Sequence, residues 1–419
     1  MHSDGHLART AARARLWADD LHGDIGARVL RLRPGSSGHA LYDAVRDHGP
    51  FVRSRRGLLF TASYAAGNHV LRSDAFGVAP TGVSRHDVVS DSTLHVHPLD
   101  DAFLRFDPPR HTELRRLVAP GVKPHHLAEL TPRIEQTVDG LLDRLASRPD
   151  ADLVTEYAEP LPVHTICHLL GLPPADAPRF TAWGRLLATV LDGSGTPRAA
   201  RRLHRVIADM SGYFQHRLHH RPPADGEGLI DVLARRCPAD LTVEDVIATG
   251  EMLLLGGFTT TAHLIGNAAH TLLRHPPGAE ARHRTGYADV VEESLRHDSP
   301  VQYTVRVART DTEVSAHPIR TGTPVVVLLA GANRDPAVFH HPHSFDASRP
   351  GVRRHLAFGA GIHFCLGAAL ARVQAETALT KLFDRYPHAR LHGPARMQPS
   401  RVLHGPARLP VRLRPTRRE

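Results

Sequence analysis

The sequence predicts a mainly α fold with a small β region. Helical periodicity covers much of the 419 residues, and the clearest helix runs from Val243 to Arg274. It opens with Thr242 and, three residues later, Asp245, which is the pattern of a capping box, and Pro276 stops it. Patterns typical of β-strands occur in four segments: Phe51–Thr61, Val301–Ala308, Thr323–Leu329 and Leu409–Leu413.

The organisation along the chain predicts one domain. We find no internal repeat and no long low-complexity linker, only short Pro/Gly/His breaks such as His219–Pro223. We therefore expect a single domain over residues 21–419, preceded by a flexible N-terminal segment, residues 1–20.

The positive charge does not indicate a nucleic-acid partner. The formal net charge is +9, but Lys123 and Lys381 are the only lysines, and the arginines are scattered through the chain instead of forming one run. A basic face for an acidic protein partner fits better.

No segment reads as a membrane anchor or a secretory signal. Met1–Arg15 lacks the apolar stretch of a signal peptide, and the longest apolar runs, around Met252–Leu255 and Val325–Ala330, are far short of the roughly 20 residues that a membrane helix needs. We expect a cytoplasmic protein that does not contact a membrane.

The three cysteines indicate neither a disulfide framework nor a zinc site, because they form an odd set without a Cys-x-x-Cys pair. Cys167 lies in an apolar stretch of sequence and is expected to be a small buried side chain. Cys237 precedes a proline in a turn and is also expected to be structural.

Two glycines stand in the middle of the long helix. Each costs roughly 1 kcal/mol relative to alanine in a helix interior. Gly256 and Gly257 would let a flat ligand approach the backbone, and the threonines that follow can bond back to carbonyls one turn earlier and open a local bend. A glycine-mediated helix crossing is the other interpretation.

A decapeptide near the C-terminus, from Phe358 to Gly367, places Cys365 just before the helical run Ala368–Val373. A helix N-terminus carries about +0.5 charge and free N–H groups, which favour a thiolate, and a thiolate is a strong iron ligand. The glycines let the loop turn sharply and bring its amides towards the sulfur. Taken alone, the cysteine also fits a buried structural thiol or a phosphatase-like nucleophile.

This decapeptide resembles the haem-binding signature of the cytochrome P450 family, because it matches the pattern F-G-x-G-x-H-x-C-x-G at every fixed position. Further motifs of the family follow in the expected order over nearly the whole chain. The resemblance implies the cytochrome P450 fold, with a long central helix over haem b and a proximal cysteine loop. It implies Cys365 as the iron ligand and Phe358, Gly367 and Gly257 as cofactor contacts.

The resemblance also implies a set of residues that bind the haem propionates. Asp107–Arg115 is similar to the family's propionate-clamping helix, with His111 and Arg115 at matching positions one turn apart. Arg306 and His363 fall where the family places further propionate contacts. Buried carboxylates need cationic partners, although each of these residues taken alone also fits an ordinary surface charge.

Glu293-Ser294-Leu295-Arg296 looks like the family's E-x-x-R helix, and Phe345–Pro350 looks like the segment that supplies a second arginine, Arg349. Two guanidinium groups can satisfy one buried carboxylate by charge-assisted hydrogen bonds. We assign Glu293, Arg296 and Arg349 to the integrity of the scaffold around the cysteine loop. The alternative is an exposed pair worth less than about 1 kcal/mol.

The catalytic motif in the long helix departs from the family. The family places an acidic residue and a threonine here, which relay protons to iron-bound oxygen; this chain keeps Thr260 but has Thr259 where the acid belongs. Positioned proton transfer contributes about 10²–10⁴-fold, so the departure bears directly on the hydroxylation rate.

The resemblance implies a monooxygenase that uses dioxygen and electrons from a ferredoxin and its reductase to oxidise a small molecule, such as a secondary-metabolite intermediate. Thr259 prompts a second hypothesis, radical coupling or cyclisation of an aromatic substrate without oxygen insertion. A non-catalytic haem sensor is the third.

The substrate itself is not identified by the sequence. The resemblance implies that Thr81–Phe103, Phe180–Gln215, Phe258, Val301–Thr304 and Arg401–Leu403 line or cover the distal pocket. Within this set we name four candidate substrate contacts: Phe258, Val301, Thr304 and Val402.

Overall fold

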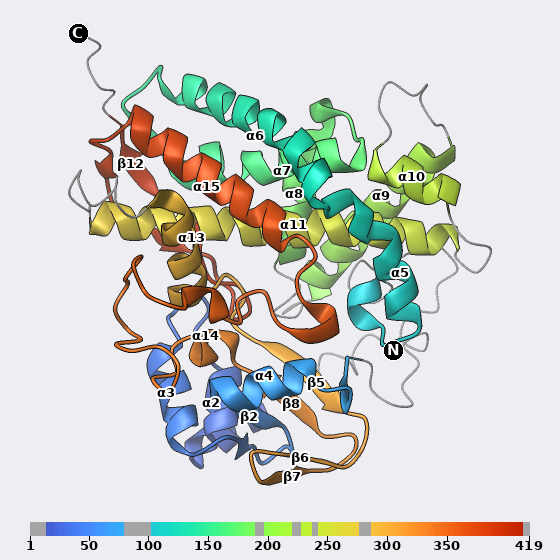
Figure 1. Cartoon of the computed structure of the whole chain (residues 1–419), viewed down its shortest axis with the longest axis vertical. Coiled ribbons are helices and arrows are strands. Elements are labelled where there is room, and N and C mark those ends of the chain that lie inside the picture. Colours follow the sequence, from blue (N-terminus) through green and yellow to red (C-terminus); the bar gives the residue numbers. More distant parts are fainter. Residues whose placement is uncertain are drawn as a thin grey trace.

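The computed structural model describes residues 14–78, 102–188, 197–219, 228–236, 242–275 and 286–413. Helices dominate and strands are short, which confirms the predicted mainly α fold with a small β region (Figure 1). The α-helices are α2 (Ile25–Leu30), α3 (His39–Asp47), α4 (Tyr64–Arg72), α5 (Arg110–Val118), α6 (Pro124–Leu145), α7 (Pro160–Leu170), α8 (Ala177–Ala188), α9 (Pro197–His219), α10 (Leu229–Arg236), α11 (Val243–Arg274), α13 (Gly286–His297), α14 (Leu329–Ala332) and α15 (Ala368–Arg385).

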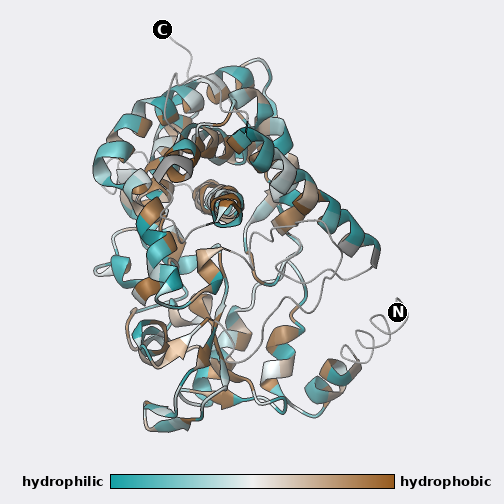
Figure 2. Cartoon of the chain, turned by 90° about the vertical axis from the view of Figure 1, so that its right-hand side faces the viewer, coloured by the Kyte–Doolittle hydropathy of each residue, from teal (hydrophilic) through white to brown (hydrophobic). Residues whose placement is uncertain are grey.

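Helix α11 is the central element. It has the predicted bounds, and the Thr242 side chain and Asp245 form the predicted capping box at its N-terminus. Most of its residues are buried, and it packs against α7, α8, α13 and α15. Figure 2 looks along α11, which is seen end-on near the centre with other helices around it. Because it crosses the whole helical layer, α11 can present side chains to a site at its middle and to another at its end. Pro276 lies outside the described residues.

The small β region contains one five-stranded sheet, with the order β1-β2-β8-β5-β3. Strands β2 and β8 are parallel, and the other pairs in this sheet are antiparallel. Its strands are β1 (Val52–Arg53), β2 (Leu59–Thr61), β3 (Phe76–Gly77), β5 (Thr304–Ala308) and β8 (Pro324–Val327). The remaining strands are β4 (Asp150–Asp152), β6 (Thr312–Val314), β7 (His317–Ile319), β9 (Arg390–Leu391), β10 (Arg396–Met397), β11 (Pro406–Arg408) and β12 (Pro410–Arg412).

Helices cover both faces of the five-stranded sheet because successive strand residues point to opposite sides. Phe60 and Val326 pack with residues of α2 and α3, whereas Leu59, Val325 and Val327 pack with residues of α4. The lower part of Figure 1 shows this layered region beneath the helical layer. Helix α4 is therefore held between the sheet and the cysteine loop described below.

The four predicted strand segments all contain strands, although each strand is shorter than its segment. Residues 14–21 form a helix, in which the Asp19 carboxylate accepts a 2.9 Å hydrogen bond from Arg56 Nε. The expected flexible segment, residues 1–20, overlaps this helix, and residues 1–13 lie outside the described ranges. Among the residues that the structure describes, no helix has the length and apolar character needed to span a bilayer.

Candidate active site around Cys365

The loop that carries Cys365 is closed by backbone hydrogen bonds. It follows a 3₁₀ turn, η7 (Gly361–His363), and leads into α15, whose N-cap is Gly367. The Cys365 N–H donates to the Phe358 carbonyl at 2.9 Å, which joins the two ends of the loop. The cysteine is exposed, so its sulfur is available to a ligand.

Gly361 fixes this loop against α4. Its φ of +70° lies in the left-handed region, and a Cβ at this position would lie 2.2 Å from the Leu71 carbonyl oxygen. Any other residue would combine backbone strain with a direct clash. The end of α4 therefore sets how closely the cysteine loop approaches the rest of the site.

The thiol of Cys365 does not gain a low pKa from the fold alone. Although the residue keeps accessible surface, desolvation by the surrounding protein raises the pKa above its ordinary value. The Gly367 backbone hydrogen bond and the charges of Arg115 and Arg372 act in the opposite direction, but burial is the larger effect. The sequence predicts that the helix N-terminus favours the thiolate, and a bound metal ion would add to that preference.

The four residues predicted to bind propionates meet beside the loop. The rings of His111 and His363 have centroids 4.3 Å apart, and Arg115 Nη2 donates to the Phe364 carbonyl at 2.6 Å. Arg306, on β5, is 7% exposed, and its guanidinium bonds Thr304 Oγ1 and the Val305 carbonyl.

These groups fit the two carboxylates of a haem. Both ring nitrogens of His111 and of His363 are buried without hydrogen-bond partners. Burial, and then the positive charges of Arg306, His111 and Arg115, lower the pKa of His363 to about 3. Asp107 partly offsets the positive potential at His111 and Arg306. Orphaned donors in a positive pocket are the environment that buried carboxylates require.

On the middle of α11, Gly256 and Thr260 share one face. A Cβ at Gly256 would meet no heavy atom within 4 Å, and the Thr260 hydroxyl donates back to the Gly256 carbonyl at 2.7 Å. This is the hydrogen bond to the carbonyl one turn earlier that is expected of a threonine in this motif. A Cβ at Gly257 would instead lie 2.7 Å from Ile166 of α7. The role predicted for Gly257 therefore fits Gly256 better, because Gly257 serves the packing of α11 on α7.

Phe258, a predicted substrate contact, is packed between helices. Its ring is 2% exposed, and a Cβ at Gly184 of α8 would lie 2.2 Å from it. Two residues of helix rotate a side chain by about 200°, so Phe258 points away from the face of Gly256 and Thr260 and into the core. Thr259 is also buried, and its hydroxyl oxygen has no hydrogen-bond partner.

The other predicted substrate contacts lie near one another. Val301 and Leu403 form an isolated antiparallel bridge, and the Gln302 N–H donates to the Val402 carbonyl at 2.8 Å. Thr304 contacts Arg306 and so adjoins the propionate cluster. Whether these residues contact a substrate stays a prediction. Residues 81–101 and 189–196, part of the predicted pocket lining, lie outside the described ranges, as does Cys237.

The predicted scaffold triad is present. Glu293 and Arg296 are fully buried, with Arg296 Nε and Nη2 donating to the two carboxylate oxygens at 2.7 and 2.6 Å. Arg349 Nε lies 3.2 Å from the same carboxylate. The guanidinium groups also donate to backbone carbonyls of residues 333–344, which precede the cysteine loop.

A second buried network next to this triad was not predicted. Glu292 Oε2 lies 3.1 Å from His355 Nε2, and both carboxylate oxygens accept hydrogen bonds from Arg372 of α15. Burial alone would raise the pKa of Glu292, but the hydrogen bonds from His355 and Arg372 outweigh it and lower the pKa to about 2. The Arg372 guanidinium also lies 4.6 Å from the ring centroid of Phe358. This network ties α13, α15 and the cysteine loop together.

Comparison with known proteins identifies the family. The family model for cytochrome P450 matches residues 287–407. A putative cytochrome P450 140 of Mycobacterium tuberculosis is 38% identical over 410 residues, covering 94% of this chain and 93% of the relative. The cytochrome P450 monooxygenase PikC of Streptomyces venezuelae is 37% identical over 327 residues, covering 75% of this chain and 77% of the relative.

Solved structures agree with the sequence comparison. The cytochrome P450 PksS of the Bacillus subtilis bacillaene polyketide synthase superposes with a TM-score of 0.79 at 26% identity, covering 90% of this chain and 98% of that one. The fold and the cysteine site define a haem-thiolate oxidoreductase. The chain belongs to the cytochrome P450 family, and its cofactor is haem b.

Proposed function

We propose that the protein is a ferredoxin-dependent monooxygenase that oxidises a secondary-metabolite intermediate. The observation that carries the proposal is the Thr260 hydroxyl, which shares the open face of α11 with Gly256 in a chain whose Cys365 loop fits the family. The similarity to a polyketide-synthase P450 supports the substrate class.

Different residues of this chain are assigned to haem binding and to the open face of α11. When bound, haem would supply the oxidation chemistry, and Cys365 would hold its iron as a thiolate that donates electron density. His111, Arg115, Arg306 and His363 would hold the propionates. Thr260 can donate or accept a hydrogen bond on the open face of α11, while Gly256 leaves that face free of a side chain.

Labelled dioxygen tests the reaction type. A screen for small molecules that shift the haem spectrum comes first, followed by turnover of the best ligand under ¹⁸O₂. We expect one labelled oxygen atom in the product, measured by mass spectrometry. A product that has lost hydrogen but carries no label would contradict oxygen insertion.

Such an unlabelled product is the signature of the second candidate, oxidative coupling or cyclisation of an aromatic substrate. Thr259, which stands where the family has an acid, is the departure that prompts this candidate. The labelling experiment therefore decides between the two.

The ferredoxin proposal predicts a salt-dependent docking step. Arg72 is exposed at the end of α4 beside Gly361, and Ile362 and Phe364 of the cysteine loop are also exposed. Arg72→Glu should raise the KM for a ferredoxin several-fold at low salt, with the difference shrinking as screening increases.

Arg390→Glu is the matched control, since it makes the same charge change on β9. The cysteine loop precedes α15 and β9 follows it, so about 27 Å of helix separates the cysteine loop from β9. Equal effects of both variants, or no effect of Arg72→Glu at any salt concentration, would contradict docking at the cysteine loop.

A further inference from the structure

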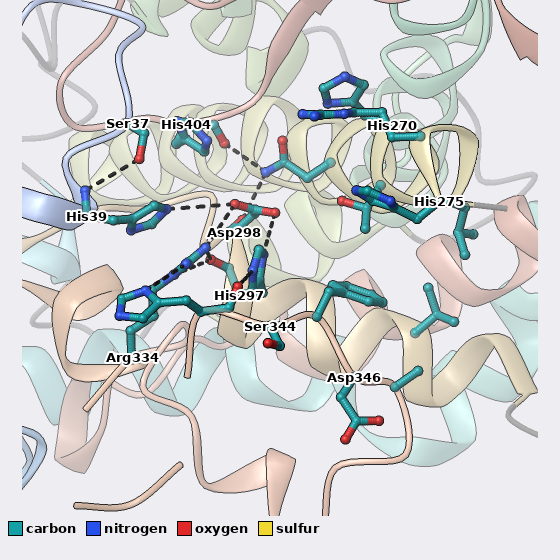
Figure 3. Close-up of a pocket in the computed structure, with 18 of the residues that line it drawn as sticks. Ser37, His39, His270, His275, His297, Asp298, Arg334, Ser344, Asp346 and His404 are labelled. Carbon is teal, nitrogen blue, oxygen red and sulfur yellow. Dashed lines mark hydrogen bonds and ion pairs between the residues drawn. The ribbon is translucent and has the colours of Figure 1, made fainter. Parts of the chain in front are cut away.

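Two buried carboxylates that are adjacent in α13 contact different parts of the molecule. Glu293 belongs to the scaffold triad, and its Oε1 also accepts a 2.8 Å hydrogen bond from the Asp346 N–H. Asp346 and Ser344 line a polar cavity of about 910 Å³ at the C-terminal end of α11, which Figure 3 shows. Neither Glu292 nor Cys365 lines that cavity. Glu292 instead bonds α15 and the segment before the cysteine loop, so its role differs from that of the triad.

The ion pair of Glu292 and Arg372 is not explained by stability. The Glu292 and His355 side chains are each 1% exposed, and that of Arg372 is 25% exposed. Removing a carboxylate and a guanidinium from water opposes most of their mutual attraction, so apolar side chains of similar volume are often as stable in their place. A charge pair in this position therefore requires another explanation.

His355 adds no charge to this pair. Its Nδ1 accepts a 3.3 Å hydrogen bond from the Ala357 N–H, so this nitrogen carries no proton. The other ring nitrogen, Nε2, therefore carries the proton and donates it to Glu292 Oε2 at 3.1 Å. An imidazole with one proton is neutral. The network thus contains one negative charge, on Glu292, and one positive charge, on Arg372.

The positive member of the pair contacts the cysteine loop. The Arg372 guanidinium lies 4.6 Å from the ring centroid of Phe358, within the range of a cation–π contact. The Phe358 carbonyl in turn accepts the hydrogen bond from the Cys365 N–H at 2.9 Å. The charge of Arg372 also acts directly on Cys365. The electrostatic environment of the sulfur therefore depends on how much of the Arg372 charge Glu292 cancels.

We propose that Glu292 and Arg372 together set the electron density that Cys365 donates to the haem iron. Arg372 is a positioning residue whose positive charge lies beside the cysteine loop. Glu292 holds that charge in place and partly cancels it. Water screens charges weakly in a buried site, so the loss of one charge here changes the potential at the iron. The inference rests on the haem-thiolate ligation of the family and is independent of the substrate and redox partner of the proposed function.

The midpoint reduction potential of the haem-loaded enzyme tests the sign of each charge. Reduction of the iron adds negative charge to the site, so Glu292→Gln should raise the potential and Arg372→Gln should lower it. The carbon–oxygen stretching frequency of the reduced carbon-monoxide complex is a second readout, because an iron with more electron density weakens that bond. We expect a higher frequency in Glu292→Gln and a lower one in Arg372→Gln. Neither measurement requires turnover.

Two further variants separate charge from packing. Arg372→Lys keeps the charge but loses the paired hydrogen bonds and the planar contact with Phe358, so both readouts should shift much less than in Arg372→Gln. The double variant Glu292→Gln/Arg372→Gln removes both charges, so its potential should return towards that of the unmodified enzyme. Equal shifts in Arg372→Lys and Arg372→Gln would overturn the proposal. So would a double variant whose potential differs more from the unmodified enzyme than that of either single variant.

Glu376→Gln is the matched control, because it makes the same charge change at an exposed position one turn beyond Arg372 on α15. Solvent and salt screen this charge, so both readouts should stay close to those of the unmodified enzyme. Shifts as large as those of Glu292→Gln would contradict a specific role for the buried pair. If Glu292→Gln does not bind haem, the comparison of Arg372→Gln with Arg372→Lys still decides. None of these results depends on whether the product carries oxygen, so this proposal and the proposed function fail separately.

Discussion

Cys365→Ala is expected to abolish oxygen activation and to remove the thiolate-type Soret band of the reduced carbon-monoxide complex. Without the sulfur, no side chain of the cysteine loop can donate comparable electron density to iron. The propionate cluster of His111, Arg115, Arg306 and His363 remains intact, so the variant should still bind haem, with weaker affinity. Spectra of the purified variant and its haem content measure the two effects separately.

Cys167→Ala is the matched control for this prediction. Cys167 is fully buried in α7, where burial raises the pKa of its thiol to about 12, so it is a packing residue. This variant should keep the thiolate band and lose only a little stability. If the band survives in Cys365→Ala, the assignment of the iron ligand is wrong.

Glu293→Ala is expected to lower the free energy of unfolding by about 3–5 kcal/mol, because it leaves two buried guanidinium groups without their carboxylate. Arg296 and Arg349 would keep only their carbonyl partners, and the segment before the cysteine loop would lose its anchor. Urea unfolding of the haem-loaded protein measures the change. We also expect faster loss of haem on dilution into apomyoglobin.

Asp139→Ala provides the comparison. The Asp139 carboxylate lies 2.7 Å from Lys381 Nζ, but both side chains are partly exposed, so this ion pair should contribute less than about 1 kcal/mol. Similar losses in the two variants would mean that the triad is no more than another surface ion pair.

The sequence predicted those parts of the site that local pattern determines. The bounds of α11 follow from its apolar period and from the capping box of Thr242 and Asp245. Both signals depend only on residues that are close together in the sequence. The position of Cys365 before a helix follows from a decapeptide with fixed spacing. His111 and Arg115 lie one turn apart on any helix, so their common face needed no tertiary information.

Errors arose where the rotation of an element or a distant partner decides the outcome. Gly256 and Gly257 are adjacent in sequence, but only the packing of α7 shows which one faces the open side. The burial of Phe258 likewise depends on a distant segment, because Gly184 of α8 leaves room for its ring. The Glu292, His355 and Arg372 network joins three segments, and no single segment carries a signal for it.

The contact of Gly361 with the Leu71 carbonyl bears on how the protein is made. The loop is shaped by a helix that leaves the ribosome almost 300 residues before it, and Arg306 and His111 come from two further stretches of chain. A nascent chain that ends before the cysteine loop therefore lacks one of the segments that would enclose the haem. We therefore expect cofactor capture late in synthesis, once contacts between segments far apart in the sequence can form.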